Sequence, residues 1–225
     1  MLSKPISYIT PFTLLDYPHH SACILWYAGC NMRCLYCYNP EIVFGKGTIE
    51  FNEVLSFLKT RIGLLDAVVF SGGECMIHKN ITEQIKQVKA LGFAVKIDTN
   101  GSKPEVLKHL IEENLVDYIA LDFKAVPDKF EQITKSNLFK PFLDTLKILT
   151  NSKINFEVRT TYHSDLLNEN DIKTIIAILA SYNYNGNYYI QYFRNNTATI
   201  EKLDWSLKNL TSDSLSTKDI QVVFR

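Results

Sequence analysis

The sequence predicts an α/β protein built on a mostly parallel sheet. Short apolar stretches of strand type alternate along the chain with longer segments whose apolar residues recur at helical spacing. Six such strand-then-helix units follow one another, and repeated units of this kind form parallel sheets through right-handed crossovers. Polar residues also gather at the points where the predicted strands end.

The predicted strands are short and rich in β-branched and aromatic residues. The stretch 22–29 (ACILWYAG) is apolar throughout, which is typical of a strand buried on both faces. The stretch 67–74 (AVVFSGGE) is a similar run that ends in glycines. The remaining predicted strands are 93–101, 117–125, 154–163 and 187–195, with 220–225 as a terminal strand.

The predicted helices fill the intervals between these strands. The segment 51–62 has apolar residues at helical spacing, which predicts a helix with one buried face. Gly92 is suited to end one helix, and Pro104 is suited to the first turn of the next. Helices are predicted over 51–62, 81–92, 104–113, and near 138–150, 169–180 and 200–210.

Length and composition are those of one domain with a sizeable core. The chain has 225 residues, of which 46% are hydrophobic, and no low-complexity linker divides it, so we expect a single domain over residues 1–225. The pattern leaves two architectures open: a doubly wound open sheet, or a barrel with fewer than eight strands.

The charge balance gives no reason to expect a nucleic-acid or membrane partner. Lys plus Arg and Asp plus Glu both number 24, so no net field attracts either one. No apolar run approaches the roughly 20 residues of a membrane helix, and the first residues lack the apolar region of a signal peptide. We therefore expect a cytoplasmic protein, whose five cysteines are thiols or metal ligands rather than disulfides.

Several polar groups are predicted to share one site. They follow the first four strands of the βα units: a cysteine cluster at 30–37, the residues Gly72, Gly73 and Glu74, the stretch 98–101, and Asp122 with Lys124. The carboxyl ends of parallel strands form one edge of a sheet, and in both open architectures this edge carries the active site.

The cysteine cluster, Cys30, Cys34 and Cys37, has the spacing C-x3-C-x2-C. Three core cysteines are one interpretation, but the segment also contains Gly, Asn and Arg and reads as a loop. A zinc site is another, although zinc takes four ligands and no second C-x2-C is present. A [4Fe–4S] cluster is the third: three thiolates leave one iron with an open position, as a catalytic metal centre requires.

At this point the sequence resembles the radical S-adenosylmethionine (SAM) superfamily. CNMRCLYC matches the superfamily motif, with Tyr36 as its aromatic residue, and Gly72-Gly73-Glu74 matches a second one. The resemblance implies a partial (β/α)6 barrel whose [4Fe–4S] cluster is held by the three cysteines. The fourth iron would be chelated by the amino and carboxylate groups of SAM, and the reduced cluster would cleave SAM to a 5′-deoxyadenosyl radical that abstracts hydrogen.

The resemblance also implies a set of SAM contacts, and no catalytic residue beyond the cluster and SAM. We expect the glycines to let the backbone approach SAM, and Glu74 to accept hydrogen bonds from its ammonium group. The expected contacts are Tyr36, Tyr38, Asn39, Gly72, Gly73, Glu74, Asp98, Asn100, Asp122, Lys124, Arg159 and His163.

Longer stretches resemble the glycyl-radical-enzyme activating proteins, in particular the type that activates anaerobic ribonucleoside-triphosphate reductase. These stretches are 12–41 (FTLLDYPHHSACILWYAGCNMRCLYCYNPE), FSGGE, LGFAVKIDTNG and LVDYIALDFKA. The resemblance implies hydrogen abstraction from a glycine of a glycyl radical enzyme, with the large subunit of that reductase as the partner. It further implies flavodoxin or ferredoxin as electron donor, and a monovalent cation near Asp98 and Thr99.

Two alternatives and two departures accompany this interpretation. A radical SAM enzyme with a small substrate, such as a 7-carboxy-7-deazaguanine synthase, is one alternative, and a zinc-stabilised binding module is the other. Tyr38 stands where the activators often carry His, and Cys75 stands where Pro is common, which bears on the substrate. We expect Cys75 to pack rather than to bind metal.

Overall fold

The computed structural model describes residues 4–208, 210–211 and 215–225. The chain divides into two compact units. The first unit contains Met1–Asn31, Asn39–Thr99 and Lys103–Ala120, and the second contains Met32–Tyr38, Asn100–Ser102 and Leu121–Arg225. The prediction of a single domain over residues 1–225 stays a prediction.

Neighbouring strands of the first unit follow chain order, from β1 through β2, β3 and β4 to β5. β1 pairs antiparallel with β2, whereas β2 with β3 and β3 with β4 are parallel. Tyr27 lies opposite Gly72, so the carboxyl ends of β2 and β3 meet at one edge. The bounds are β1 Ile6–Thr13, β2 Ala22–Tyr27, β3 Ala67–Gly72, β4 Ala94–Thr99 and β5 Tyr118–Asp122.

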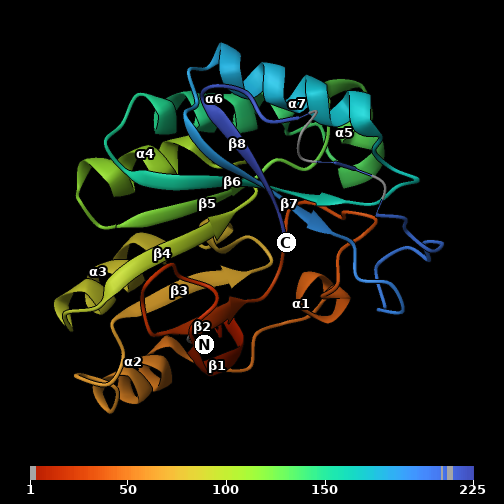
Figure 1. Cartoon of the computed structure of the whole chain (residues 1–225). Coiled ribbons are helices and arrows are strands. Elements are labelled where there is room, and N and C mark those ends of the chain that lie inside the picture. Colours follow the sequence, from red (N-terminus) through yellow and green to blue (C-terminus); the bar gives the residue numbers. More distant parts are fainter. Residues whose placement is uncertain (1–3, 209, 212–214) are drawn as a thin grey trace. The chain divides into compact units, whose positions relative to one another are not determined.

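The second unit takes up the last residues of β5 and continues in the order β6, β7, β8. β6 with β7 and β7 with β8 are parallel, and Tyr162 lies opposite Tyr192 near the carboxyl ends of β6 and β7. The bounds are β6 Asn155–Tyr162, β7 Gly186–Tyr192 and β8 Ile220–Phe224. In Figure 1, α6 and α7 lie on the same side of β6.

The helices begin at residues that suit a helix N-terminus. Capping boxes start α2 and α7, at Glu50 and Asn168, and prolines occupy the first turns of α1, α4 and α5. The bounds are α1 Pro40–Phe44, α2 Phe51–Lys59, α3 Ile81–Ala90, α4 Pro104–Glu112, α5 Pro127–Thr134, α6 Phe139–Thr150 and α7 Glu169–Ser181, with a short 3₁₀ helix η1 at Cys75–Ile77.

The alternation of strands and helices is confirmed, and two of its details are corrected. β1 was not predicted, because its residues are mostly exposed or half-buried and Pro11 interrupts the run. The predicted helix near 200–210 is wrong: the described residues 200–208 and 210 contain no helix. Ser206 instead donates its backbone N–H to Asn195 Oδ1 (2.8 Å) and accepts the N–H of Ser164 (3.1 Å), as polar residues do when they compete with helical bonds.

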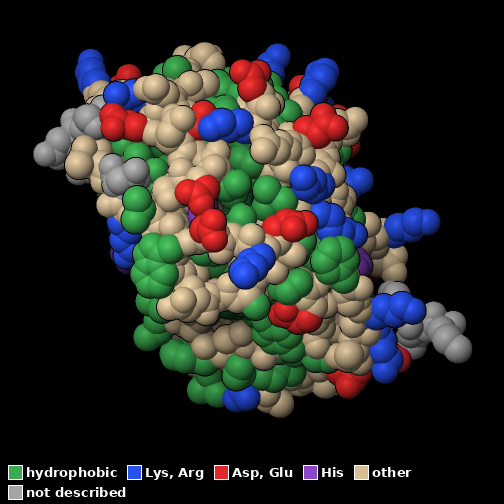
Figure 2. All heavy atoms as spheres, turned by 90° about the vertical axis from the view of Figure 1, so that its right-hand side faces the viewer, with side chains coloured by type: hydrophobic (Ala, Val, Ile, Leu, Met, Phe, Trp, Pro, Cys, Tyr) green, Lys and Arg blue, Asp and Glu red, His purple; other side chains and the backbone are tan. Residues whose placement is uncertain are grey.

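The surface agrees with the charge balance of the sequence. On the face shown in Figure 2, positive and negative side chains are interspersed, and hydrophobic side chains gather toward the lower part of the view. No helix in the described ranges is long and apolar enough to cross a membrane.

Candidate functional site: cysteine-bearing loops and strand ends

Cys30 follows β2 at the end of a short segment held by hydrogen bonds within the first unit. Ala28 donates its N–H to Pro5 O (2.9 Å), and Gly29 donates to Ile42 O of α1 (2.8 Å). The carbonyl of Gly29 accepts the N–H of Glu74 (3.0 Å), and that of Ala28 lies 2.9 Å from His78 Nε2. Three separate parts of the first unit therefore fix the backbone that leads to Cys30.

His78 supports this segment through a neutral ring. Burial lowers the pKa of His78, although the hydrogen bond to Ala28 O opposes the shift. A carbonyl can only accept, so Nε2 carries the proton. Sequence reasoning assigned no role to His78, and no motif marks it.

Gly72 and Gly73 allow β3 to approach the cysteine segment closely. A Cβ on Gly73 would lie 1.9 Å from Gly29 O and 3.2 Å from the Cβ of Cys30, and one on Gly72 would lie 2.4 Å from Tyr27 N. Gly72 also has φ +112°, which side chains rarely adopt. From the sequence we expected these glycines to leave room for a ligand. In the structure they leave room for the backbone beside Cys30.

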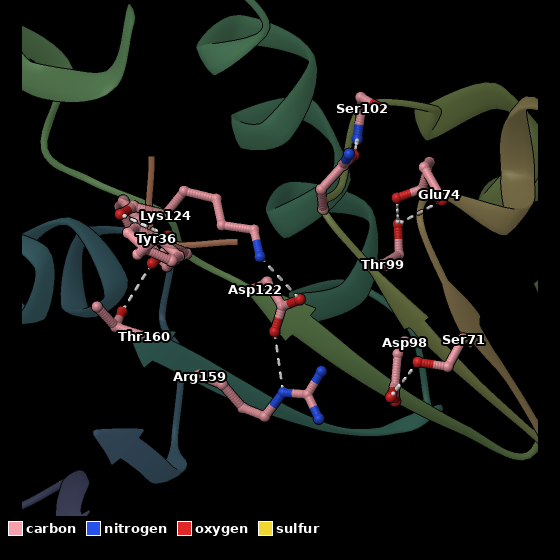
Figure 3. Close-up of polar contacts among 12 residues, drawn as sticks. Tyr36, Ser71, Glu74, Asp98, Thr99, Ser102, Asp122, Lys124, Arg159 and Thr160 are labelled. Atoms are coloured by element: carbon pink, nitrogen blue, oxygen red, sulfur yellow. Dashed lines mark hydrogen bonds and ion pairs between the residues drawn. The ribbon is translucent and has the colours of Figure 1, made fainter. Parts of the chain in front are cut away.

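Glu74 is a fully buried carboxylate joined to the end of β4. Thr99 Oγ1 donates to its two oxygens (3.2 and 3.0 Å), and the N–H of Met76 donates to Oε1 (3.1 Å). Figure 3 shows Glu74 and Thr99 turned toward each other. These bonds offset part of the cost of burying the charge.

Asp98 is engaged by two neighbours that the sequence did not single out. Its Oδ1 lies 2.5 Å from Lys96 Nζ, and Ser71 Oγ donates to its Oδ2 (3.0 Å). The side chain of Lys96 is only 1% exposed, so Asp98 supplies the counter-charge that a buried ammonium group requires. Alternating residues of a strand share a face, which is the pattern that brings Lys96 to Asp98.

The thiol of Cys75 is buried next to these carboxylates. Its Sγ lies 3.9 Å from Phe70 O and 4.0 Å from Asp98 O. Burial, reinforced by Glu74 and Asp98, raises the pKa of Cys75 well above its usual value. Burial also raises the pKa of Cys23 to about 12. Both groups are neutral thiols at neutral pH, whereas a metal ligand or nucleophile is a thiolate.

We expect Cys23 and Cys75 to resist alkylation in the folded protein. Iodoacetamide reacts with thiolates, and a raised pKa lowers the thiolate fraction at pH 8 in addition to the shielding by burial. Residue-resolved mass spectrometry should show little modification of either residue, and full modification after unfolding in guanidinium. Labelling of Cys75 at the same rate in both states would contradict the assignment.

Asp122, Lys124 and Arg159 form an ion-pair cluster in the second unit. Asp122 Oδ2 lies 3.1 Å from Lys124 Nζ, and Oδ1 lies 2.9 Å from Arg159 Nε (Figure 3). Burial tends to raise the pKa of Asp122, but the two cations outweigh it and lower the pKa. For Lys124, burial acts to lower the pKa, but Asp122, together with smaller contributions from Tyr36 and Cys34, outweighs it and raises the pKa. All three groups are therefore charged at neutral pH.

Asn100 lies in a local turn. Its Oδ1 accepts the N–H of Ser102 (3.0 Å), and the carbonyl of Gly101 accepts the hydroxyl of Thr145 on α6 (2.7 Å). Such a bond from an Asn side chain to the backbone two residues on is a common turn device. The turn uses Asn100 Oδ1, and the contact of Asn100 with SAM stays a prediction.

The loop with Cys34 and Cys37 belongs to the second unit. The N–H of Cys37 donates to Cys34 O (3.0 Å). The ring of Tyr36 is buried, and its hydroxyl donates to Lys124 O (3.3 Å). Burial is the largest of the causes that raise the pKa of Tyr36, so its hydroxyl stays protonated and serves as a donor.

The other predicted contacts have partners within the chain. The hydroxyl of Tyr38 accepts the N–H of Arg194 (2.8 Å), and the carbonyl of Asn39 accepts two N–H groups of α1 (3.1 Å each). His163 is fully buried: Nδ1 accepts the N–H of Asp165 (3.2 Å), so Nε2 carries the proton and donates to Asp204 O (3.0 Å). Both ring nitrogens of His163 are thus used inside the protein.

The predicted site residues are divided between the two units. Cys30, Gly72, Gly73, Glu74 and Asp98 are in the first, together with Asn39. The second holds Cys34, Cys37, Tyr36, Tyr38, Asn100, Asp122, Lys124, Arg159 and His163. Within either unit, the described residues hold no group of three His, Cys, Asp or Glu side chains placed to bind a metal ion.

This chain belongs to the radical SAM superfamily, whose family model matches residues 24–180. Enzymes of this family use a [4Fe–4S] cluster and SAM, so the predicted cofactors are confirmed at the level of the family. The superfamily resemblance found in the sequence is confirmed with it.

Three curated proteins show where the chain falls within the family. It is 34% identical over 181 residues to the "Putative glycyl-radical enzyme activating enzyme MJ1227" of Methanocaldococcus jannaschii, covering 76% of this chain and 73% of that protein. It is 29% identical to a pyruvate formate-lyase-activating enzyme of Clostridium pasteurianum, and this match covers 60% of this chain and 59% of that enzyme. It is 25% identical to a 7-carboxy-7-deazaguanine synthase of Aquifex aeolicus, and this match covers 63% of this chain and 74% of that enzyme.

A solved structure confirms the predicted fold class. SuiB of Streptococcus suis, bound to S-adenosylmethionine, superposes with a TM-score of 0.70 at 11% identity, over 90% of this chain and 51% of SuiB. The chain thus spans about half the length of SuiB. Among the described residues, the strand order runs from β1 to β8, with these two strands at its ends.

Proposed function

We propose that this radical SAM enzyme activates a glycyl radical enzyme. In the proposed reaction a hydrogen atom moves from the Cα of a partner glycine to the 5′ carbon of the adenosyl group of SAM, leaving a radical on the glycine. The observation that carries the proposal is the 34% identity to the M. jannaschii protein over most of both chains. The large subunit of an anaerobic ribonucleotide reductase is the proposed partner, with flavodoxin or ferredoxin as electron donor and the cytoplasm as the location.

We propose Cys30, Cys34 and Cys37 as the ligands of the [4Fe–4S] cluster. The donor set fits: all five cysteines lie in the described part of the chain, and none forms a disulfide. Cys23 and Cys75 are buried neutral thiols, whereas the three motif cysteines lie in loops beyond strand ends. When bound, the reduced cluster supplies the electron that cleaves the sulfonium group of SAM.

The charged groups at the strand ends are the proposed SAM contacts. Lys124 is suited to bind the carboxylate of SAM, because Asp122 keeps its ammonium group charged and oriented. Glu74, fixed by Thr99, is suited to accept from the ammonium group. A monovalent cation near Asp98 and Thr99 remains part of the proposal, although Asp98 is also engaged by Lys96.

Replacing Lys124 by Met should weaken SAM binding. A hydrogen bond to a charged group contributes about 1.5–3 kcal/mol, which corresponds to roughly a 10- to 100-fold rise in the Kd of SAM. Asp122 keeps its bond to Arg159 in this variant, so the strand end should stay folded. Lys129→Met is the matched control, since Lys129 is also half-buried and paired, with Asp171 (2.6 Å). Equal affinity in both variants, measured by calorimetry, would remove Lys124 from the site.

Electron paramagnetic resonance on a candidate partner tests the proposed function. The protein, SAM and a reductant are incubated anaerobically with the large subunit of an anaerobic ribonucleotide reductase. The proposal predicts a glycyl doublet on the subunit that is absent when its radical-site glycine is replaced by Ala. It also predicts that the subunit accelerates SAM cleavage, because in the proposed reaction the partner itself covers the site during hydrogen abstraction.

A small-molecule substrate is the second candidate. The similarity to the 7-carboxy-7-deazaguanine synthase, which covers 74% of that protein, favours it. Rapid turnover of a heterocycle without any protein partner, together with the absence of a glycyl doublet, would support this candidate over the first.

A further inference from the structure

The loop that carries Cys34 and Cys37 is hydrogen-bonded along one side to the end of α5. Arg33 donates its N–H to Thr134 O (2.8 Å), and Leu35 donates to Ile133 O (3.0 Å). The last carbonyls of a helix have no partner within the helix, and here the loop supplies N–H donors for the carbonyls of Ile133 and Thr134. Lys135 then leaves the helix in the left-handed conformation, with φ 54°.

The segment 193–201, which follows β7, bonds to the same loop. Ile200 donates its N–H to Cys37 O (3.2 Å), and Glu201 donates to Leu35 O (3.1 Å). Leu35 is therefore held through its N–H by α5 and through its carbonyl by this segment. The bond to Cys37 O acts directly on one proposed cluster ligand.

Tyr38 adds a side-chain contact to these backbone bonds. Its hydroxyl accepts the N–H of Arg194 (2.8 Å), and its ring stacks on Phe193 with the centroids 5.4 Å apart. Tyr38 directly follows Cys37 in the chain, so both contacts act one residue away from the thiol.

The segment is itself anchored to the end of β6. The N–H of Phe193 donates to Tyr162 O (2.9 Å), and the ring of Phe193 contacts His163, with the centroids 4.6 Å apart. Further along, His163 donates to Asp204 O (3.0 Å). The segment thus has a fixed attachment of its own and can hold the loop in place.

We propose that residues 193–201 form a clamp that retains the iron–sulfur cluster, and that Tyr38 is its main positioning residue. The inference rests on membership of the radical SAM family and on Cys37 as a ligand, and it does not depend on the identity of the substrate. Loosening Tyr38 frees the backbone at Cys37, which lets this thiolate leave the cluster more often. The clamp acts on the rate of cluster loss.

The test measures iron release from the holoprotein into EDTA under anaerobic conditions. The release is monitored through the loss of the visible absorbance of the cluster. Tyr38→Phe removes the hydroxyl and keeps the ring, while Tyr38→Ala removes both contacts. Loss of one hydrogen bond corresponds to about a fivefold faster release in Tyr38→Phe, and the release in Tyr38→Ala should be faster again.

Tyr184→Phe is the matched control. Its hydroxyl also makes a hydrogen bond to the backbone of the second unit, which it donates to Asn187 O (2.6 Å), but this bond is remote in sequence from the cysteine loop. This variant should release iron at the wild-type rate even if its thermal midpoint falls. Release from both Tyr38 variants at the rate of the wild type, or at that of Tyr184→Phe, would overturn the proposal.

Discussion

Replacing Cys34 by Ala is expected to abolish reductive cleavage of SAM. Cys34 is 8% exposed and lies in the loop fixed by α5 and by residues 200 and 201. Its loss would leave only two thiolates of the motif for the cluster, which requires three from this chain if SAM is to occupy the fourth iron. Iron content after anaerobic reconstitution should fall well below four per chain, and 5′-deoxyadenosine should be undetectable.

Cys23→Ala provides the control for this variant. Cys23 is fully buried within β2, and its raised pKa marks it as a packing residue. We expect normal iron content and cleavage, with a small loss of thermal stability from the cavity. Full cleavage activity in Cys34→Ala would contradict the assignment of Cys34 as a cluster ligand.

Gly73→Val is expected to lose both the cluster and SAM cleavage. A Cβ at this position would lie 1.9 Å from Gly29 O, so the backbone that leads to Cys30 has to move. Forcing extra atoms into a packed site typically costs about 1–3 kcal/mol, and here the displaced group precedes a proposed ligand. Iron content and 5′-deoxyadenosine formation should fall together, whereas occlusion of SAM alone would leave the iron in place.

Gly92→Ala separates this effect from general destabilisation. Gly92 has φ +91° and open space around its Cβ position, so the substitution introduces backbone strain without a collision. This variant should lose stability but keep its iron. If Gly73→Val binds iron and SAM as Gly92→Ala does, the close approach of β3 to Cys30 has no functional role.

The sequence was most informative where one residue type has one physical use. Gly72, Gly73, Asp98, Thr99 and Asp122 mark the ends of β3, β4 and β5, because buried strands are mostly apolar before they reach the edge of the sheet. The cysteine spacing was similarly specific, since few structures other than a metal centre need three thiols in eight residues.

The sequence was least informative where long-range partners decide a residue's role. Lys96 reads as an ordinary strand residue until Asp98 is found beside it, and no pattern in the sequence indicates that both ring nitrogens of His163 bond within the chain. The segment 193–201 has no regular structure, so neither its periodicity nor its composition indicates the bonds to Leu35 and Cys37.

The fate of a single hydrogen atom tests the central claim most directly. The candidate partner is prepared with glycine deuterated at Cα and incubated with this protein, SAM and a reductant, and the 5′-deoxyadenosine formed is analysed by mass spectrometry. Activation of a glycyl radical enzyme predicts a product heavier by one deuterium, and unlabelled product when the radical-site glycine of the partner is Ala. Unlabelled 5′-deoxyadenosine from the intact deuterated partner would contradict the claim.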